Sequence, residues 1–170
     1  MSLGYRVNVK TEGRLAEYLA TIKNIEKWVT NIGFIDGATY PTGQKVAYIA
    51  YLNEYGQHNP PRPFLKRTMD KNYNAWTKLI TVRIRSKGLN EDSVRDALKA
   101  AGIMAVGDVK RTIAEWPHDD PRMNKPATIR AKARKSEGKG GKNQVANDPT
   151  RVLHDTGRMI SSVRYEVVTK

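Results

Sequence analysis

Two long stretches with an apolar residue at every third or fourth position constrain the fold of this chain more than any other feature. The first spans residues 64–85 and the second spans residues 90–113. Both are far longer than the strands of small domains, and the spacing is that of a helix with one buried face. Gly88 lies between them, at a position where glycine readily ends a helix. We therefore expect two long helices that pack by their apolar faces.

Each stretch places its apolar residues on one helical face. In the first stretch these are Leu65, Met69, Tyr73, Trp76, Leu79, Ile80 and Ile84. In the second they are Val94, Leu98, Ala101, Ala105, Val109 and Ile113. Asn90 is the expected N-cap of the second helix, because its side chain can accept a backbone N–H of the first turn. Trp116-Pro117 is expected to close that helix.

The segments before residue 64 predict shorter elements. Residues 5–10 alternate apolar and polar side chains and predict a half-buried strand. Thr11 is then a plausible cap for a helix whose apolar stripe runs from Leu15 to Trp28, and a turn with a short strand is expected within residues 31–37. Residues 44–55 fit a strand or a helix, and the alanines favour a helix that ends at Gly56.

The prolines at positions 60, 61 and 63 predict an extended arm over residues 59–63. A final alternating run, residues 161–168, predicts a strand. The length of 170 residues fits a single domain spanning residues 1–170. We therefore expect an α+β fold, in which a small antiparallel sheet packs against long α-helices, with an extended proline arm and a flexible basic loop within residues 117–150.

Positive charge is concentrated in the last third of the chain. The net charge is +13, and residues 122–142 carry eight basic residues against one acidic residue. This charge fits either a solvated face or contact with a polyanion. Because no aromatic residue lies between the basic ones, phosphates are the expected contact on nucleic acid. The residues expected to face DNA or an acidic surface are Lys125, Arg130, Lys132, Arg134, Lys135, Lys139 and Lys142.

Several classes of protein are excluded or disfavoured. The chain has no cysteine, so it forms no disulfide, thiol nucleophile or iron–sulfur site. No apolar run approaches the ~20 residues of a membrane span, and the first residues lack the pattern of a secretory signal. A carboxylate–histidine metal site could draw on His58, His118 and His154, but their spacing does not favour it. No nucleophile elbow or phosphate-binding fingerprint is present, so we expect neither an enzyme nor a bound cofactor.

Three stretches form an unusual combination. The first contains Ala50 and Asn53-Glu54-Tyr55-Gly56, followed by Pro61-Arg62-Pro63-Phe64. The second is the segment from Pro126 to Lys132. The third contains Leu153, Asp155-Thr156-Gly157 and Met159, followed by Ser162-Val163. In this order and spacing, the chain resembles the tail-completion, or neck, proteins of tailed bacteriophages over residues 32–168.

Two features depart from that family pattern. His154 stands where the family often has a small aliphatic residue, and a Gly/Lys-rich insertion precedes the third stretch. These two departures bear on the backbone conformation expected around the third stretch more than on the resemblance itself.

The resemblance implies a structural virion protein at the head–tail junction. Such a protein, made in the host cytoplasm, would form a six-fold ring that contacts tail terminator, tail tube and head connector proteins around the packaged DNA. Arg62 in the stiff arm is expected to pair with a carboxylate of a neighbouring subunit. The residues expected at such interfaces are Asn53, Glu54, Tyr55, Pro61, Arg62, Pro63, Phe64, Asp155, Thr156 and Arg158.

Other functions remain open at this stage. A tail terminator and a head-side stopper ring are structural alternatives that differ in the neighbouring ring they contact. A sequence-independent protein that binds duplex nucleic acid is the alternative from a different class, and it predicts a steep salt dependence of binding. A metal-dependent hydrolase ranks third.

Overall fold

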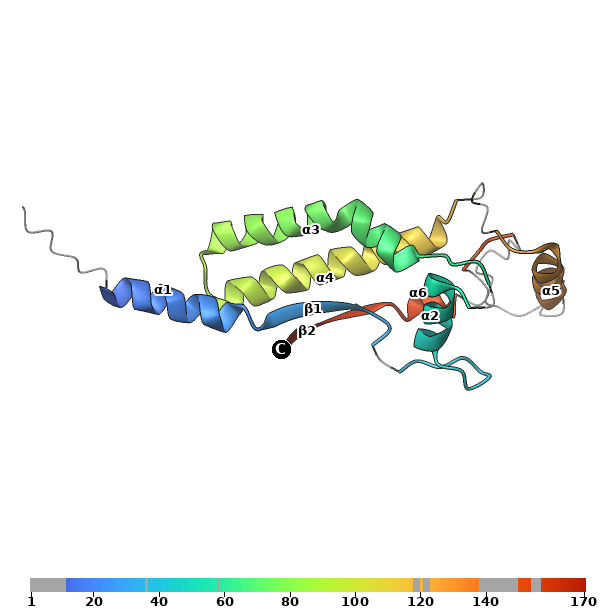
Figure 1. Ribbon diagram of the computed structural model, residues 1–170, viewed down its shortest axis with the longest axis horizontal. Coiled ribbons are helices and arrows are strands. Elements are labelled where there is room, and N and C mark those ends of the chain that lie inside the picture. Colours follow the sequence, from blue (N-terminus) through green and yellow to red (C-terminus); the bar gives the residue numbers. More distant parts are fainter. Residues whose placement is uncertain are drawn as a thin grey trace, which may run out of the picture.

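A computed structural model gives the fold, and six helices and two strands lie in the part of the chain that it describes (Figure 1). The described residues are 12–35, 37–57, 59–117, 120, 123–137, 150–153 and 157–170, with backbone alone at 12–15 and 135–137. In chain order the elements are α1 (Glu12–Ile25), β1 (Trp28–Gly33), α2 (Val46–Tyr55), α3 (Phe64–Lys87), α4 (Glu91–Ala114), α5 (Pro126–Glu137), α6 (Arg158–Ser161) and β2 (Arg164–Thr169). The predicted α+β class, with a small antiparallel sheet against long helices, is confirmed.

Helix α4 is the middle layer of the molecule, with α3 along one side and the β1–β2 sheet along the other (Figure 1). Its N-terminus is capped as predicted, since the Asn90 side chain accepts the Ser93 N–H at 2.8 Å. The predicted apolar face is also correct, because Val94, Ala101, Ala105, Val109 and Ile113 are all buried. Small alanines on this face let both neighbouring layers approach closely.

The buried row of α3 differs from the prediction. Met69 and Tyr73 are 53% and 58% exposed, whereas Phe64 and Thr68 are fully buried. Thr68 tolerates burial because its hydroxyl donates to the Phe64 carbonyl and lies 2.7 Å from the Thr112 hydroxyl of α4. Because this side chain is polar, an interpretation based on hydrophobicity alone missed the true contact row.

A second polar contact joins the two long helices. The indole Nε1 of Trp76 donates to the carboxylate of Asp108 at 2.8 Å. Arg111 lies 3.3 Å from the other oxygen of the same carboxylate. The buried acid is therefore satisfied by two donors, as burial of a charge requires.

The two strands pair antiparallel, with Trp28 opposite Thr169 and Ile32 opposite Tyr165. Trp28 was predicted on a helix, but α1 ends at Ile25 and Trp28 opens β1. There its indole stacks under the guanidinium of Arg95 on α4, 5.0 Å from the ring centre. The strand therefore begins earlier than the predicted 31–37.

The last strand begins later than predicted. The run 161–168 was expected to be extended, but Arg158–Ser161 form the short helix α6 and β2 starts at Arg164. One side of the sheet faces α4, because the Thr30 hydroxyl donates to the Leu98 carbonyl at 3.3 Å and the Tyr165 ring lies against Gly102. Asn31 and Glu166, which are bonded to each other at 3.0 Å, therefore point to the opposite side.

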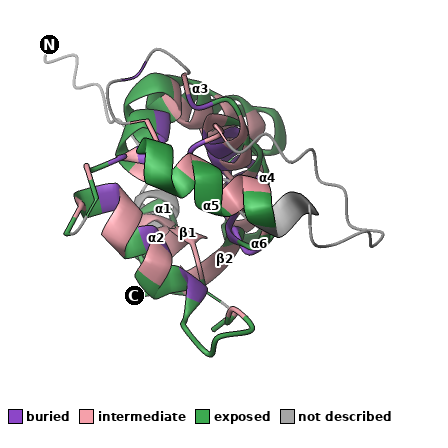
Figure 2. Cartoon of the chain, turned by 90° about the vertical axis from the view of Figure 1, so that its right-hand side faces the viewer, coloured by how far each residue is buried: buried purple, intermediate pink, exposed green. Residues whose placement is uncertain are grey.

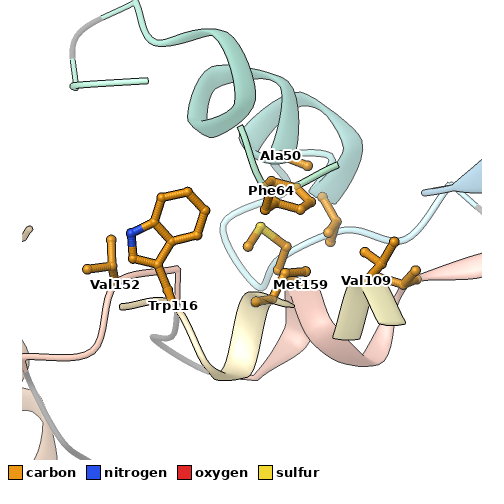
Figure 3. Packing of buried hydrophobic residues seen from close by; sticks show 9 residues of the cluster. Ala50, Phe64, Val109, Trp116, Val152 and Met159 are labelled. Atoms are coloured by element: carbon orange, nitrogen blue, oxygen red, sulfur yellow. The ribbon is translucent and has the colours of Figure 1, made fainter. Parts of the chain in front are cut away.

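The hydrophobic core lies at one end of the molecule, where α2, the start of α3, the end of α4 and α6 meet (Figure 3). Phe64 and Met159 pack at its centre, and Trp116 packs against Val152. The predicted helix over residues 44–55 is confirmed as α2, and Gly56 follows it as the C-cap. The predicted strand 5–10 and the cap Thr11 lie outside the described residues.

The predicted basic loop over residues 117–150 contains a helix. Pro126 opens α5, and alanines at positions 127, 131 and 133 favour helix through Glu137. Residues 138–149 of the predicted loop lie outside the described residues. None of the described helices is both long and apolar enough to cross a membrane.

Candidate functional site

The three stretches singled out in the sequence meet around one cavity of about 170 Å³ beside the core. The first stretch contributes Asn53 and Arg62, the second Thr128 and Lys132, and the third Leu153 and Gly157 to Met159; Tyr40, Ile49 and Asn124 complete the described lining. Segments more than ninety residues apart in sequence therefore form one local structure. Local spacing in the sequence carries no information about such long-range contacts, so it could not place the second stretch against the other two.

The proline arm packs against its own domain. Arg62 is only 6% exposed, and its backbone N–H donates to the Asn53 carbonyl at 2.6 Å. Its guanidinium donates to the Met123 carbonyl at 3.3 Å. In this fold the Arg62 side chain joins the arm to the segment before α5. Its pairing with a carboxylate of a neighbouring subunit stays a prediction.

Glu54, a predicted interface residue, also has a role inside the chain. Its carboxylate is buried and accepts the N–H groups of Leu65 and Lys66, both at 2.9 Å. These are orphan donors in the first turn of α3, whose N-cap residue Pro63 has no side-chain bond to offer. Glu54 therefore caps the next helix from a distance, where its charge also suits the positive helix end. Phe64, another predicted interface residue, is fully buried in the core.

Gly56 allows α2 and the arm to meet. Its φ is +70°, which glycine adopts without strain. A Cβ there would lie 2.7 Å from the Asn59 carbonyl oxygen and from the Pro61 nitrogen. Three residues of the Asn-Glu-Tyr-Gly segment therefore have roles in packing. The Asn53 amide donates to the Ile49 carbonyl at 2.8 Å, Glu54 caps α3, and Gly56 is required for the close approach.

The third stretch closes the other side of the cavity. Gly157 is left-handed, with φ +70°, and precedes α6. The Arg158 guanidinium donates to the Thr39 carbonyl, and Met159 enters the core. Leu153 is also left-handed, with φ +61°, a conformation that costs a side-chain-bearing residue about 1–2 kcal/mol. Asp155 and Thr156, predicted at an interface, lie outside the described residues.

Helix α5 divides the predicted basic residues into two groups. The ammonium of Lys132 turns inward and donates to the Arg151 carbonyl at 2.8 Å. Lys125, Arg130 and Arg134 are exposed on the outer surface, at the end of the molecule opposite α1 (Figures 1 and 2). The side chain of Lys135, and Lys139 and Lys142 entirely, lie outside the described residues. Exposed guanidiniums suit phosphates or carboxylates of a partner.

An exposed tyrosine row on α2 was missed in the sequence. Tyr48, Tyr51 and Tyr55 are 52%, 49% and 67% exposed, and the rings of the last two lie 4.8 Å apart between centres. Their spacing of three and four positions was the signal available, because it puts all three on one helical face. Of the predicted interface residues, Tyr55, Pro61 and Arg158 are exposed and can contact another molecule.

Two further observations bear on the class of function. Within the described residues, no three side chains of His, Cys, Asp or Glu gather in a way that could hold a metal ion. His58, His118, His154 and Asp119 lie outside those residues. Comparisons with protein-family models, with curated proteins and with solved structures give no match to this chain.

Proposed function

We propose that this chain is a structural protein of a tailed-bacteriophage particle, located at the head–tail junction. It would assemble as a six-fold ring that completes the tail and joins it to the head connector around the DNA channel. The observation that carries the proposal is the convergence of the three tail-completion-like stretches on one cavity.

The exposed surfaces suit a subunit of an assembly. The tyrosine row on α2 offers the kind of residue that is enriched where proteins meet. Because Arg62 and Glu54 are engaged inside the chain, we assign the neighbour contact to Tyr48, Tyr51 and Tyr55. The exposed Arg130 and Arg134 on α5 would face packaged DNA or an acidic neighbouring ring.

Within this class, a tail terminator and a head-side stopper ring stay alternatives. A tail-completion protein would bind purified tails, a terminator would bind the tube end and stop its growth, and a stopper would bind the portal side. Mixing the chain with isolated tails and, separately, with emptied heads distinguishes these positions.

The proposal is tested in the particle. We expect gold-labelled antibody against this chain to mark the junction between head and tail in purified particles. The double variant Tyr51→Ser with Tyr55→Ser should be incorporated into particles at least ~10-fold less than the wild type, because two aromatic contact residues are lost. The matched control is Tyr73→Ser, on an exposed position of α3 away from the row. Labelling of the capsid shell, or absence from particles, would overturn the proposal.

A second candidate is a protein that binds duplex nucleic acid without sequence preference, and α5 is the observation that favours it. Arg130 and Arg134 lie one helical turn apart on an exposed face. If they bind phosphates, the double change to Ala should reduce the slope of log affinity against log salt by about 2. The charge-matched control, Arg85→Ala with Lys99→Ala, changes exposed residues on α3 and α4. An equal slope for all three proteins would remove this candidate.

A further inference from the structure

Helix α1 carries an apolar stripe that its own chain leaves uncovered. Tyr18 and Leu19 are 53% and 50% exposed, while Ile22 and Ile25 near the C-terminal end are half-buried. Figure 1 shows why: α1 extends beyond the body of the molecule and meets α4 only near its end. A lone amphipathic helix of 14 residues gains little stability by itself and is normally held by packing of its apolar face.

The β1–β2 sheet is the second incomplete feature. In the described part of the chain, no third strand pairs with the outer edge of either β1 or β2. An open edge presents unpaired N–H and C=O groups to any extended segment that reaches it. This two-stranded sheet is held by packing against α4, and a third strand would stabilise it further through additional ladder hydrogen bonds.

Residues 5–10, directly before α1, have the alternation of a strand. With α1 intact, however, chain length leaves little of their own sheet within reach of these residues. The sheet begins at Trp28, just past the C-terminal end of α1, and the 14-residue helix places its first residue about 21 Å away. Six extended residues span at most about 21 Å, so a segment running back along α1 reaches only the near end of the sheet.

We infer that residues 5–10 of one copy of this chain add as an edge strand to the β1–β2 sheet of a second copy, with α1 as the connecting arm. The side-chain pattern fits the sheet. Tyr5, Val7 and Val9 would extend the side that faces α4, where Ile32 and Tyr165 lie. Arg6, Asn8 and Lys10 would extend the outer side, where Glu166 offers a carboxylate to a basic partner.

Such a contact joins unlike surfaces of the two copies, the arm of one and the sheet of the next. Repeated contacts of this kind produce a closed ring or an open fibre, according to the angle between copies. The inference goes beyond the proposed function, because the contact would exist whether or not the assembly joins a phage head to a tail.

The natural absence of cysteine permits a direct test by disulfide trapping. A tagged Asn8→Cys chain is mixed with an untagged Asn31→Cys chain (β1) or an untagged Glu166→Cys chain (β2), and the mixture is oxidised. We expect a tagged–untagged heterodimer with at least one sheet variant. The control is untagged Lys87→Cys, an exposed position at the end of α3, which should not link. Linking of neither sheet variant overturns the inference, as does equal linking of the control.

A second measurement uses the full chain without cysteines. Val7→Pro removes a strand N–H and should raise the concentration needed for self-association by ~10-fold or more, whereas Val7→Thr, which keeps strand propensity, should change it by under ~3-fold. Light scattering measures the association. Equal association of wild type and Val7→Pro, or a wild type that stays monomeric at ~100 μM, contradicts the inference. If heterodimers are trapped but the chain is absent from phage particles, the proposed function is refuted and the strand-addition inference stands.

Discussion

At the scale of single residues, polar groups decide how the segments of this chain meet. Glu54 on α2 caps α3, and the backbone N–H of Arg62 returns to the Asn53 carbonyl. These bonds join two helices across a proline arm that can form no regular structure of its own. The arm is therefore fixed by hydrogen bonds at both ends, which explains why Arg62 and Glu54 are buried and satisfied.

Removal of the Glu54 carboxylate should destabilise the fold. Glu54→Ala leaves two N–H groups of α3 without their acceptor, and we expect it to lower the free energy of unfolding by about 3 kcal/mol. Glu54→Gln keeps one acceptor and should cost about half as much. Urea unfolding measures both. The control Glu91→Ala, at an exposed first-turn position of α4, should cost under ~1 kcal/mol. Equal losses for Glu54→Ala and Glu91→Ala would contradict the capping role.

Gly102 and Gly107 of α4 provide a matched pair of sites for testing how the sheet packs against this helix. A Cβ at Gly102 would overlap the ring of Tyr165 on β2, whereas a Cβ at Gly107 meets no atom within 4 Å. Gly102→Ala should therefore lower the unfolding free energy by about 1–3 kcal/mol. Gly107→Ala should raise it by about 0.5–1 kcal/mol, since alanine favours helix. If Gly102→Ala stabilised the protein as well, the sheet would not lie against α4 as described.

At the scale of elements, the end of α3 is joined to the start of α4 by a carboxylate with two cationic partners. Asp96 lies 2.7 Å from the Lys87 ammonium and 3.2 Å from the Arg83 guanidinium. The hydrogen bond and charge of Lys87, and more weakly of Arg83, lower the pKa of Asp96 below its ordinary value of 3.8. The group is solvent-exposed, so the contribution is small and sensitive to salt.

The sign of the pH effect follows from that shift. Because the pKa of Asp96 is lower in the folded chain, its contribution to stability is complete above pH 3.8 and is lost as the pH falls through the lowered value. Lys87→Met should raise the pKa of Asp96 toward 3.8, and NMR titration of the carboxyl carbon measures it. The control Lys99→Met should leave it unchanged. An unchanged pKa in Lys87→Met would show that the ion pair does not form in solution.

The sequence predicted some elements well and others poorly, for physical reasons. Helix α4 was correct from cap to apolar face because it is buried on two sides, and most of its buried residues are small or apolar. In α3, the buried hydroxyl of Thr68 and the exposed ring of Tyr73 depart from the expected pattern, whereas Leu79, Ile80 and Ile84 are half-buried. Trp28 matched a helical stripe, but its contact with Arg95 and its pairing with Thr169 belong to a strand. Such long-range contacts are not encoded in local spacing.

Several residues that line the cavity belong to the motifs named in the sequence, but their arrangement around a cavity was not predicted. The motifs named Asn53, Arg62 and Arg158, which do line one cavity. The internal contact of Arg62 was not foreseen, because its partner carbonyl at Met123 lies 61 residues away in sequence. Its expected contact with a neighbour stays a prediction. Of the tyrosine row on α2, the sequence analysis named Tyr55 and overlooked Tyr48 and Tyr51, although all three lie on one helical face.

At the scale of the whole molecule, the core with its neighbouring exposed surfaces and the protruding helix α1 lie at opposite ends. The core, the cavity, the tyrosine row and basic α5 occupy one end, and α1 with its uncovered stripe extends from the other (Figure 1). Copies of such a molecule can contact each other through unlike ends, which suits a ring. The net charge of +13 suits a position beside a dense polyanion.

The central claim is that this chain completes phage tails, and one measurement tests it most directly. The mass of the purified chain is determined alone, and then after mixing with tails that lack their head-proximal end. The account predicts that the chain joins those tails as a ring of fixed copy number and restores their attachment to heads. A chain that ignores the tails but shifts duplex DNA would contradict the claim and favour the nucleic-acid-binding alternative.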